Sequence, residues 1–201
     1  MHDAGERWSH NLHYHPVVIG AIPAGCERAL DVGCGEGTLT RQIRAIVPDV
    51  TGIDLDQPSV DLARAHPDAS DIRYLRGDFL SYPFAAGSFD FISSVAALHH
   101  MDAAAALGRM RALLRPGGVL AVLGLARPRY PADAPAELAG LIAHRYYLLT
   151  RSVWEHPSPI VWPPPDTFKA TRAKAAAELP GVRYRRHVLW RYSLIWVKPN
   201  D

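Results

Sequence analysis

The stretch LDVGCGEGTL, residues 30–39, decides the fold. An apolar run at 29–32 is typical of a buried strand, three glycines follow at alternate positions, and apolar residues with helical spacing begin at Leu39. Strand, glycine turn and helix in this order open a βαβ unit. Glycine has no Cβ, so such a loop takes positive φ and lets a ligand lie against bare backbone. The helix N-terminus beneath the loop presents free N–H groups to that ligand.

The spacing of these glycines indicates which ligand the loop holds. A dinucleotide loop reads GxGxxG, whereas here Gly33, Gly35 and Gly37 alternate and Asp31 precedes them. A carboxylate at that point suits a ligand with an ammonium group better than a pyrophosphate. The phrase DVGCGEG resembles the first signature of class I S-adenosylmethionine (SAM) dependent methyltransferases. This resemblance implies SAM as the cofactor and S-adenosylhomocysteine as its product.

Two later segments extend the resemblance, each at the end of an expected strand. A strand at 50–54 ends in Asp54, where an acid accepts the ribose hydroxyls of a bound nucleoside. The alternative for Asp54 is a helix N-cap, for which Asp56 is better placed. A strand at 72–76 leads to an aspartate and a phenylalanine, which in this family typically meet the adenine ring. The predicted cofactor-binding residues are Asp31, Gly33, Cys34, Gly35, Asp54, Leu55, Asp78, Phe79 and Val95.

A fourth expected strand, at 88–94, leads into the sequence VAALHHM, residues 95–101. This segment resembles the FD…LHH segment of small-molecule methyltransferases, whose residues here face the reactive methyl group. His99 and His100 are therefore candidate catalytic bases, because imidazole titrates near neutral pH. The alternative is a role for this pair in the fold or in cofactor packing. A further family phrase, LLRPGGVL at 113–120, marks a helix end and a tight turn before a strand at 119–123.

The resemblance, with these segments in the family's order, implies an α/β fold with one Rossmann-like domain over residues 1–201. Its sheet is expected to have seven strands in the order 3-2-1-4-5-7-6, with strand 7 antiparallel and helices on both faces. A terminal hairpin is expected at 182–189 and 192–197. We divide the chain into an N-terminal arm (1–25), a SAM-binding core (26–126), an inserted helical and loop lid (127–167), and a terminal helix and hairpin (168–201).

The arm and the insertion carry many aromatic side chains outside the expected core. We predict that these two segments close over the substrate site, with permanent core packing as the alternative. The spacing of His10, His13 and His15 also suits a metal, but no acidic or cysteine partner is obvious, so we predict no metal site. The predicted substrate or lid residues are His13, Tyr14, Tyr147 and Trp162.

Composition narrows the class of protein. The 201 residues are 48% hydrophobic, yet no apolar run approaches the ~20 residues of a membrane span. A net charge of +2 is too small to favour nucleic acid as a partner. The start lacks the apolar region of a secretory signal, and the two cysteines suggest no disulfide framework. We expect a cytoplasmic protein without a membrane partner and leave its oligomeric state open.

The resemblance predicts methyl transfer from SAM to an O, N or C nucleophile of a small organic acceptor. The segment after the fourth strand lacks the (D/N/S)PP(Y/F) signature of amino-group methylation on adenine or glutamine amide. Two alternatives stay open. One is a SAM-binding protein with a non-methylating role, whose binding residues look the same. The other is a nicotinamide-dependent oxidoreductase, which the glycine spacing and Asp31 disfavour.

Overall fold

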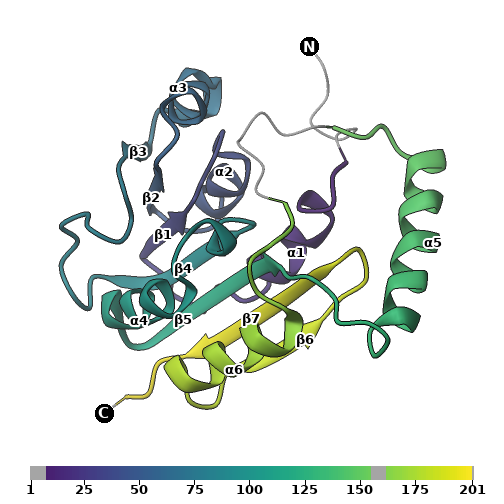
Figure 1. Ribbon diagram of the computed structural model, residues 1–201. Helices are drawn as coiled ribbons and strands as arrows, with labels where there is room; N and C mark the ends of the chain where they lie inside the picture. The colour runs from purple at the N-terminus through teal and green to yellow at the C-terminus, as the bar shows by residue number, and fades with distance from the viewer. Residues whose placement is uncertain (1–7, 155–161, 201) are drawn as a thin grey trace.

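A computed structural model describes residues 8–154 and 162–200, and its centre is a seven-stranded sheet (Figure 1). The strand order is β3-β2-β1-β4-β5-β7-β6. β7 runs antiparallel to β5 and β6, and the remaining neighbours pair in parallel. The predicted order and the reversed seventh strand are confirmed. The strands are β1 (Arg28–Val32), β2 (Asp49–Asp54), β3 (Ile72–Arg76), β4 (Phe89–Val95), β5 (Leu114–Leu125), β6 (Arg183–Arg186) and β7 (Arg191–Val197).

The helices begin where the sequence supplies caps. Asp56, Asp102 and Thr167 each accept a hydrogen bond from the backbone N–H three residues ahead, at the starts of α3, α4 and α6. Asp56, and not Asp54, therefore caps α3. The α-helices are α1 (His15–Ile19), α2 (Thr38–Arg44), α3 (Gln57–Ala65), α4 (Ala103–Leu113), α5 (Ala134–Thr150) and α6 (Phe168–Glu178). Short 3-10 helices are η1 (Leu12–Tyr14), η2 (Pro67–Ala69) and η3 (Leu98–His100).

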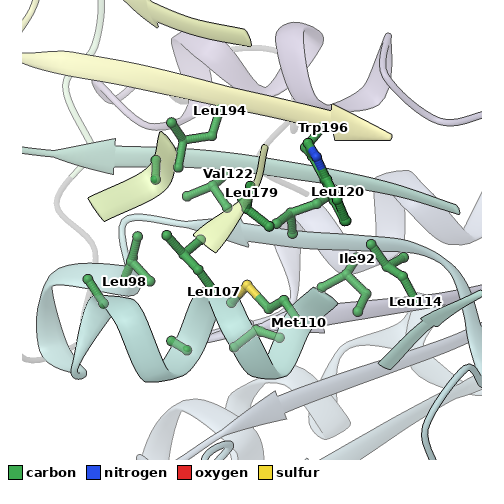
Figure 2. Close-up of a cluster of buried hydrophobic side chains, with 14 of the residues drawn as sticks. Ile92, Leu98, Leu107, Met110, Leu114, Leu120, Val122, Leu179, Leu194 and Trp196 are labelled. Carbon is green, nitrogen blue, oxygen red and sulfur yellow. The ribbon is translucent and has the colours of Figure 1, made fainter. Parts of the chain in front are cut away.

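Both faces of the sheet are buried, as β5 shows residue by residue. Leu120 and Val122 belong to the cluster that includes Leu107 and Met110 of α4 and Leu179 just after α6 (Figure 2). The alternate residues of β5 pack in a second cluster with α1 and α2. Successive side chains of a strand point to opposite faces, so a strand covered on both sides is apolar throughout. Helices therefore lie on both faces, as predicted.

Two strands differ from their expected limits. β5 begins at Leu114, ahead of the proline and glycines, because Leu114 already pairs with Phe89 before the register shifts. β6 ends at Arg186, short of the expected 189, because Leu189 and Trp190 have φ values of 59° and 58°. Such left-handed backbone cannot continue a strand.

The helix α5 stands apart at one side of the sheet, away from the contacting pair α4 and α6 (Figure 1). Ala143 and Tyr147 pack against the cluster that contains α1 and α2. Asp133, just before α5, pairs with Arg186 of β6, and Glu137 accepts a hydrogen bond from Trp190 at 2.9 Å. α5 is thus tied to the β6–β7 hairpin. In the described part of the chain, no helix is both long and apolar enough to cross a membrane.

Candidate active site

A cavity of about 1230 Å³ lies at the carboxyl ends of the parallel strands, where open α/β sheets bind their ligands. The ends of β1, β2, β3, β4 and β5 all contribute, and the N-terminal arm and α5 add further walls. The strand order divides the cavity. Most of the lining carboxylates lie at the ends of β1, β2 and β3, whereas the side toward β4, β5 and β7 carries histidines and one arginine, together with Asp102 at the start of α4.

The glycine loop packs against η3 and β2. Gly33 has a φ of 71°, and a Cβ at this position would lie 2.1 Å from the Cβ of Ala97. Glycine is therefore required here both by backbone conformation and by space. The N–H of Gly35 donates to Oδ2 of Asp54 over 2.8 Å, which joins the loop to the end of β2.

Asp31 is the buried acid of the site. Only 1% of it is exposed, and its two oxygens accept hydrogen bonds from Thr40 Oγ1 at 2.7 Å and Ser93 Oγ at 2.8 Å. Among the described residues no basic side chain forms an ion pair with it. Burial raises the pKa of Asp31 to about 6, against the two hydroxyl bonds that lower it and with a smaller rise from Asp54. A bound cation would stabilise its ionised form.

Asp54 and Asp78 present fixed carboxylates along the same wall. Asp54 accepts from the N–H groups of Gly35 and Asp56, the latter at 2.9 Å. Asp78 accepts from the Leu80 N–H and the Ser81 hydroxyl, both at 3.0 Å. A carboxylate has about four lone-pair sites, so each retains acceptor capacity for a ligand.

The two candidate histidines lie on the other side of the loop. His99 and His100 belong to η3, and their rings are 4.2 Å apart. Nδ1 of His99 is buried and has no hydrogen-bond partner among the described residues. Burial lowers the pKa of His99 to about 4, with further lowering by His100 and Arg191. Burial also lowers the pKa of His100, which the charge of Asp54 partly offsets.

Comparison with known proteins identifies the family. A family described as a methyltransferase domain matches residues 30–122. An uncharacterized methyltransferase of Mycobacterium bovis is 35% identical over 193 residues, which cover 96% of this chain and 98% of that one. The demethylmenaquinone methyltransferase of a Roseiflexus strain is 37% identical over 118 residues, or 57% of this chain and 50% of its own.

The chain belongs to the class I SAM-dependent methyltransferases. Solved structures agree at the level of the fold. The YcgJ protein of Bacillus subtilis superposes with a TM-score of 0.61 at 21% identity, covering 87% of this chain and 70% of its own. The phosphoethanolamine N-methyltransferase 2 of Haemonchus contortus, solved with SAM, gives 0.65 at 15% identity over 93% and 52%.

The cofactor of this methyltransferase is SAM, which removes the nicotinamide alternative, and the observed site suits it. The buried acid without a described cationic partner, the space kept by Gly33 and the carboxylates of Asp54 and Asp78 fit an ammonium group and a nucleoside. Every predicted cofactor-binding residue and both candidate histidines line the cavity. Their individual roles remain predictions.

The predicted substrate and lid residues lie elsewhere in the methyltransferase. The described lining of the cavity includes none of His13, Tyr14, Tyr147 and Trp162. Tyr147 stacks on Trp8 with ring centroids 4.7 Å apart, and the Tyr14 hydroxyl donates to the carbonyl of Val188 at 2.7 Å. Leu12, His15 and Leu148, the neighbours of His13, Tyr14 and Tyr147 in sequence, line the cavity in their place.

The sequence did not predict the cavity wall formed by the N-terminal arm, α5 and the start of β7. Asn11, His144 and Arg191 line it, although no motif marks them and they are far apart in the chain. Their spacing carries no signal, since only the docking of the arm and α5 brings them together. The histidines of the arm also separate: His10 bonds His144, and His15 bonds Gln42 at 2.8 Å. No group of metal-ligating side chains gathers within the described ranges.

Proposed function

We propose that the protein is a cytoplasmic enzyme that transfers a methyl group from SAM to a small organic acceptor. The observation that carries this proposal is the continuity of the cavity, which joins carboxylates at β1, β2 and β3 to histidines and apolar side chains at β4, β5 and α5. One half suits the cofactor, and the adjoining half has room for an acceptor.

The residues of the cofactor half have distinct tasks in this proposal. Asp31 pairs with the ammonium group, Asp54 accepts the ribose hydroxyls, and Asp78 with Phe79 meets the adenine ring. When bound, SAM supplies an electrophilic methyl group on a sulfonium. The chain then has to align the acceptor, exclude water and, where the acceptor holds a proton, receive it. His99 and His100 are the candidates to receive a proton.

Relatives of the protein support a small acceptor. The matched proteins include demethylmenaquinone methyltransferases, an O-methyltransferase of Penicillium expansum and a sterol 24-C-methyltransferase of Gibberella zeae. Their names span O and C nucleophiles, so they support the acceptor class and not one nucleophile. The two cysteines are free thiols, which supports a reducing compartment.

Calorimetry tests the proposal directly. We expect the protein to bind SAM and S-adenosylhomocysteine, and Asp54→Ala to weaken binding by about 1–3 kcal/mol because ligand hydroxyls lose their acceptor. Asp61→Ala on the exposed side of α3 is the matched control and should leave binding unchanged. Equal or tighter binding of NADH would contradict the proposal.

A further inference from the structure

Arg191 is a buried cation at the edge of the acceptor half. It begins β7 opposite Leu125 of β5, is 7% exposed, and lines the cavity. No carboxylate pairs with it in the described part of the chain. Buried charges in proteins normally have an ionic partner, because leaving water costs several kcal/mol per ion. An arginine without one next to a ligand cavity requires an explanation.

An amide takes the place of the expected carboxylate. Oδ1 of Asn11 accepts from Nε at 3.0 Å and from Nη2 at 2.8 Å, and the carbonyl of Leu189 accepts from Nη1 at 3.2 Å. The two bonds to one oxygen hold the guanidinium in place without cancelling its charge. Aspartate has nearly the same shape as asparagine and would complete an ion pair here. The chain therefore keeps a net positive charge at this wall.

The guanidinium also keeps unused donors. Arginine carries five N–H groups, and the three bonds to Asn11 and Leu189 leave two. Burial lowers the pKa of Arg191 to about 10, which still leaves it charged near neutral pH. Its fork geometry suits the paired oxygens of an acid.

The backbone ahead of Arg191 is strained in a way that fixes its position. Leu189 and Trp190 both have positive φ, which costs of order 1–3 kcal/mol for each non-glycine residue. Trp190 is held by Glu137 of α5, and the side chain of Leu189 is 1% exposed. The strained turn thus delivers Arg191 to the cavity at the start of β7.

The titratable side chains that interact with Arg191 include His10, His99 and Tyr14, and no carboxylate of the described residues is among them. Nε2 of His10 and Nδ1 of His144 lie 3.0 Å apart in a hydrogen bond. Burial lowers the pKa of His10 to about 4, and the charges of Arg191, His144 and His13 lower it further. The charge of Arg191 also lowers the pKa of His99. His10 and His99 therefore remain uncharged near neutral pH, so an incoming anion on this side of the cavity meets the cation of Arg191 beside neutral imidazoles.

We infer that the acceptor carries an anionic acid group, of the carboxylate class, which pairs with Arg191 in the acceptor half of the cavity. This inference rests on the proposed function and names its substrate class. With one oxygen of the acid on Arg191, its other oxygen would attack the methyl group, so that an O–C bond forms as the methyl–sulfur bond breaks, S-adenosylhomocysteine leaves and no proton has to be removed. Methylation of such an acceptor therefore does not need His99 as a base. The lowered pKa of His99 would make it a weak base for an ordinary hydroxyl.

The test measures anion preference on the full chain saturated with S-adenosylhomocysteine. Calorimetry compares acetate, malonate, benzoate and salicylate, each with its neutral amide. We expect at least one acid to bind tenfold or more tightly than its amide. Asn11→Asp should abolish this preference, because it keeps both hydrogen bonds to Arg191 while supplying the missing charge. Arg191→Gln should abolish it as well. Arg183→Gln, on exposed β6, is the matched control and should retain it.

Different results would count against the proposed function and against the role of Arg191. Failure of S-adenosylhomocysteine itself to bind would count against the proposed function. Normal cofactor binding with no acid preferred over its amide would overturn this inference alone. An unchanged preference in Asn11→Asp would also overturn it, since Arg191 would then only fasten the arm to β7. If Arg191→Gln does not fold, Asn11→Asp still decides, because its ion pair is expected to raise the melting temperature.

Discussion

At the scale of single residues, the charge of Asp31 affects both the stability of the folded protein and the binding of the ligand. Its pKa of about 6 lies above the ordinary 3.8, so its favourable contribution to folding is complete below pH 3.8 and is lost as the pH rises through about 6. At neutral pH the unliganded protein therefore carries an unfavourable buried charge. An ammonium group of the ligand would pair with that charge and stabilise the folded state.

Asp31→Asn should therefore separate the two properties. We expect a higher melting temperature of the unliganded protein at pH 8, with the gain shrinking toward pH 5, where wild-type Asp31 is itself protonated. Binding of S-adenosylhomocysteine at pH 8 should weaken by about tenfold or more, the size of a lost charge-assisted bond. Calorimetric scans and titrations at both pH values measure this. A variant with lower stability and unchanged affinity would make Asp31 a structural acid.

His99 carries a prediction about pH dependence. Its pKa is lowered to about 4, so its neutral form is already complete well below neutrality. If neutral His99 assists the reaction, kcat at saturating SAM should be level from pH 6 to 8 and fall only as the pH drops toward 4. With an acceptor that must lose a proton, His99→Asn should lower kcat by roughly a hundredfold with little change in SAM affinity, whereas methylation of a carboxylate should change far less. A rate that follows one ionisation near pH 7 and survives in the variant would exclude His99 as that group.

At the scale of elements, Gly33 of the glycine loop contacts Ala97, the residue just before η3, so closely that a side chain at position 33 has no room. Gly33→Ala should be destabilising for two reasons, its positive φ and its clash with the Cβ of Ala97. Adding Ala97→Gly removes the clash and leaves the backbone strain of roughly 1 kcal/mol. We expect the double variant to recover part of both stability and SAM affinity. Denaturant unfolding and calorimetry complete the double-mutant cycle. No recovery would show that backbone conformation alone requires Gly33.

Elements with a local sequence pattern could be predicted from the sequence, whereas contacts between distant segments could not. The strand that ends in Asp54, the strand before Asp78, the glycine loop and the hairpin carry local patterns, and with the family resemblance these patterns predicted the strand order and residues that line the cofactor half. The acceptor half is built by docking instead. Asn11 and Arg191 meet through long-range contacts, and the strained turn at Leu189 and Trp190 lacks the glycine that would mark it. Local patterns carry no information on such contacts.

At the scale of the whole molecule, the arm and the segment after α5 form one roof over the cavity. The N–H of Trp8 donates to Ser152 at 3.2 Å, and the N–H of Trp154 donates to Trp8 at 2.8 Å. Trp8 is 7% exposed and stacks on Tyr147 of α5. Residues of both segments line the cavity beside Arg191. The two segments are therefore joined to each other through Trp8, and the arm also contacts α5 through the hydrogen bond of His10 to His144.

Hydrogen exchange on Trp8→Ala in the full chain tests whether the arm and the segment after α5 open together. Truncating a buried tryptophan typically costs 3–5 kcal/mol, yet the strands of the sheet pair with one another without the arm. The loss should therefore appear as local opening, with faster exchange at residues 8–15 and 150–154 together and little change in β1, β4 and β5. Leu138→Ala on the exposed face of α5 is the control, and its exchange should match wild type. S-adenosylhomocysteine should restore part of the protection in Trp8→Ala, because the two segments border its cavity. Equal acceleration across the central strands would show instead that the arm and the sheet unfold as one body, and a movable roof would then be ruled out.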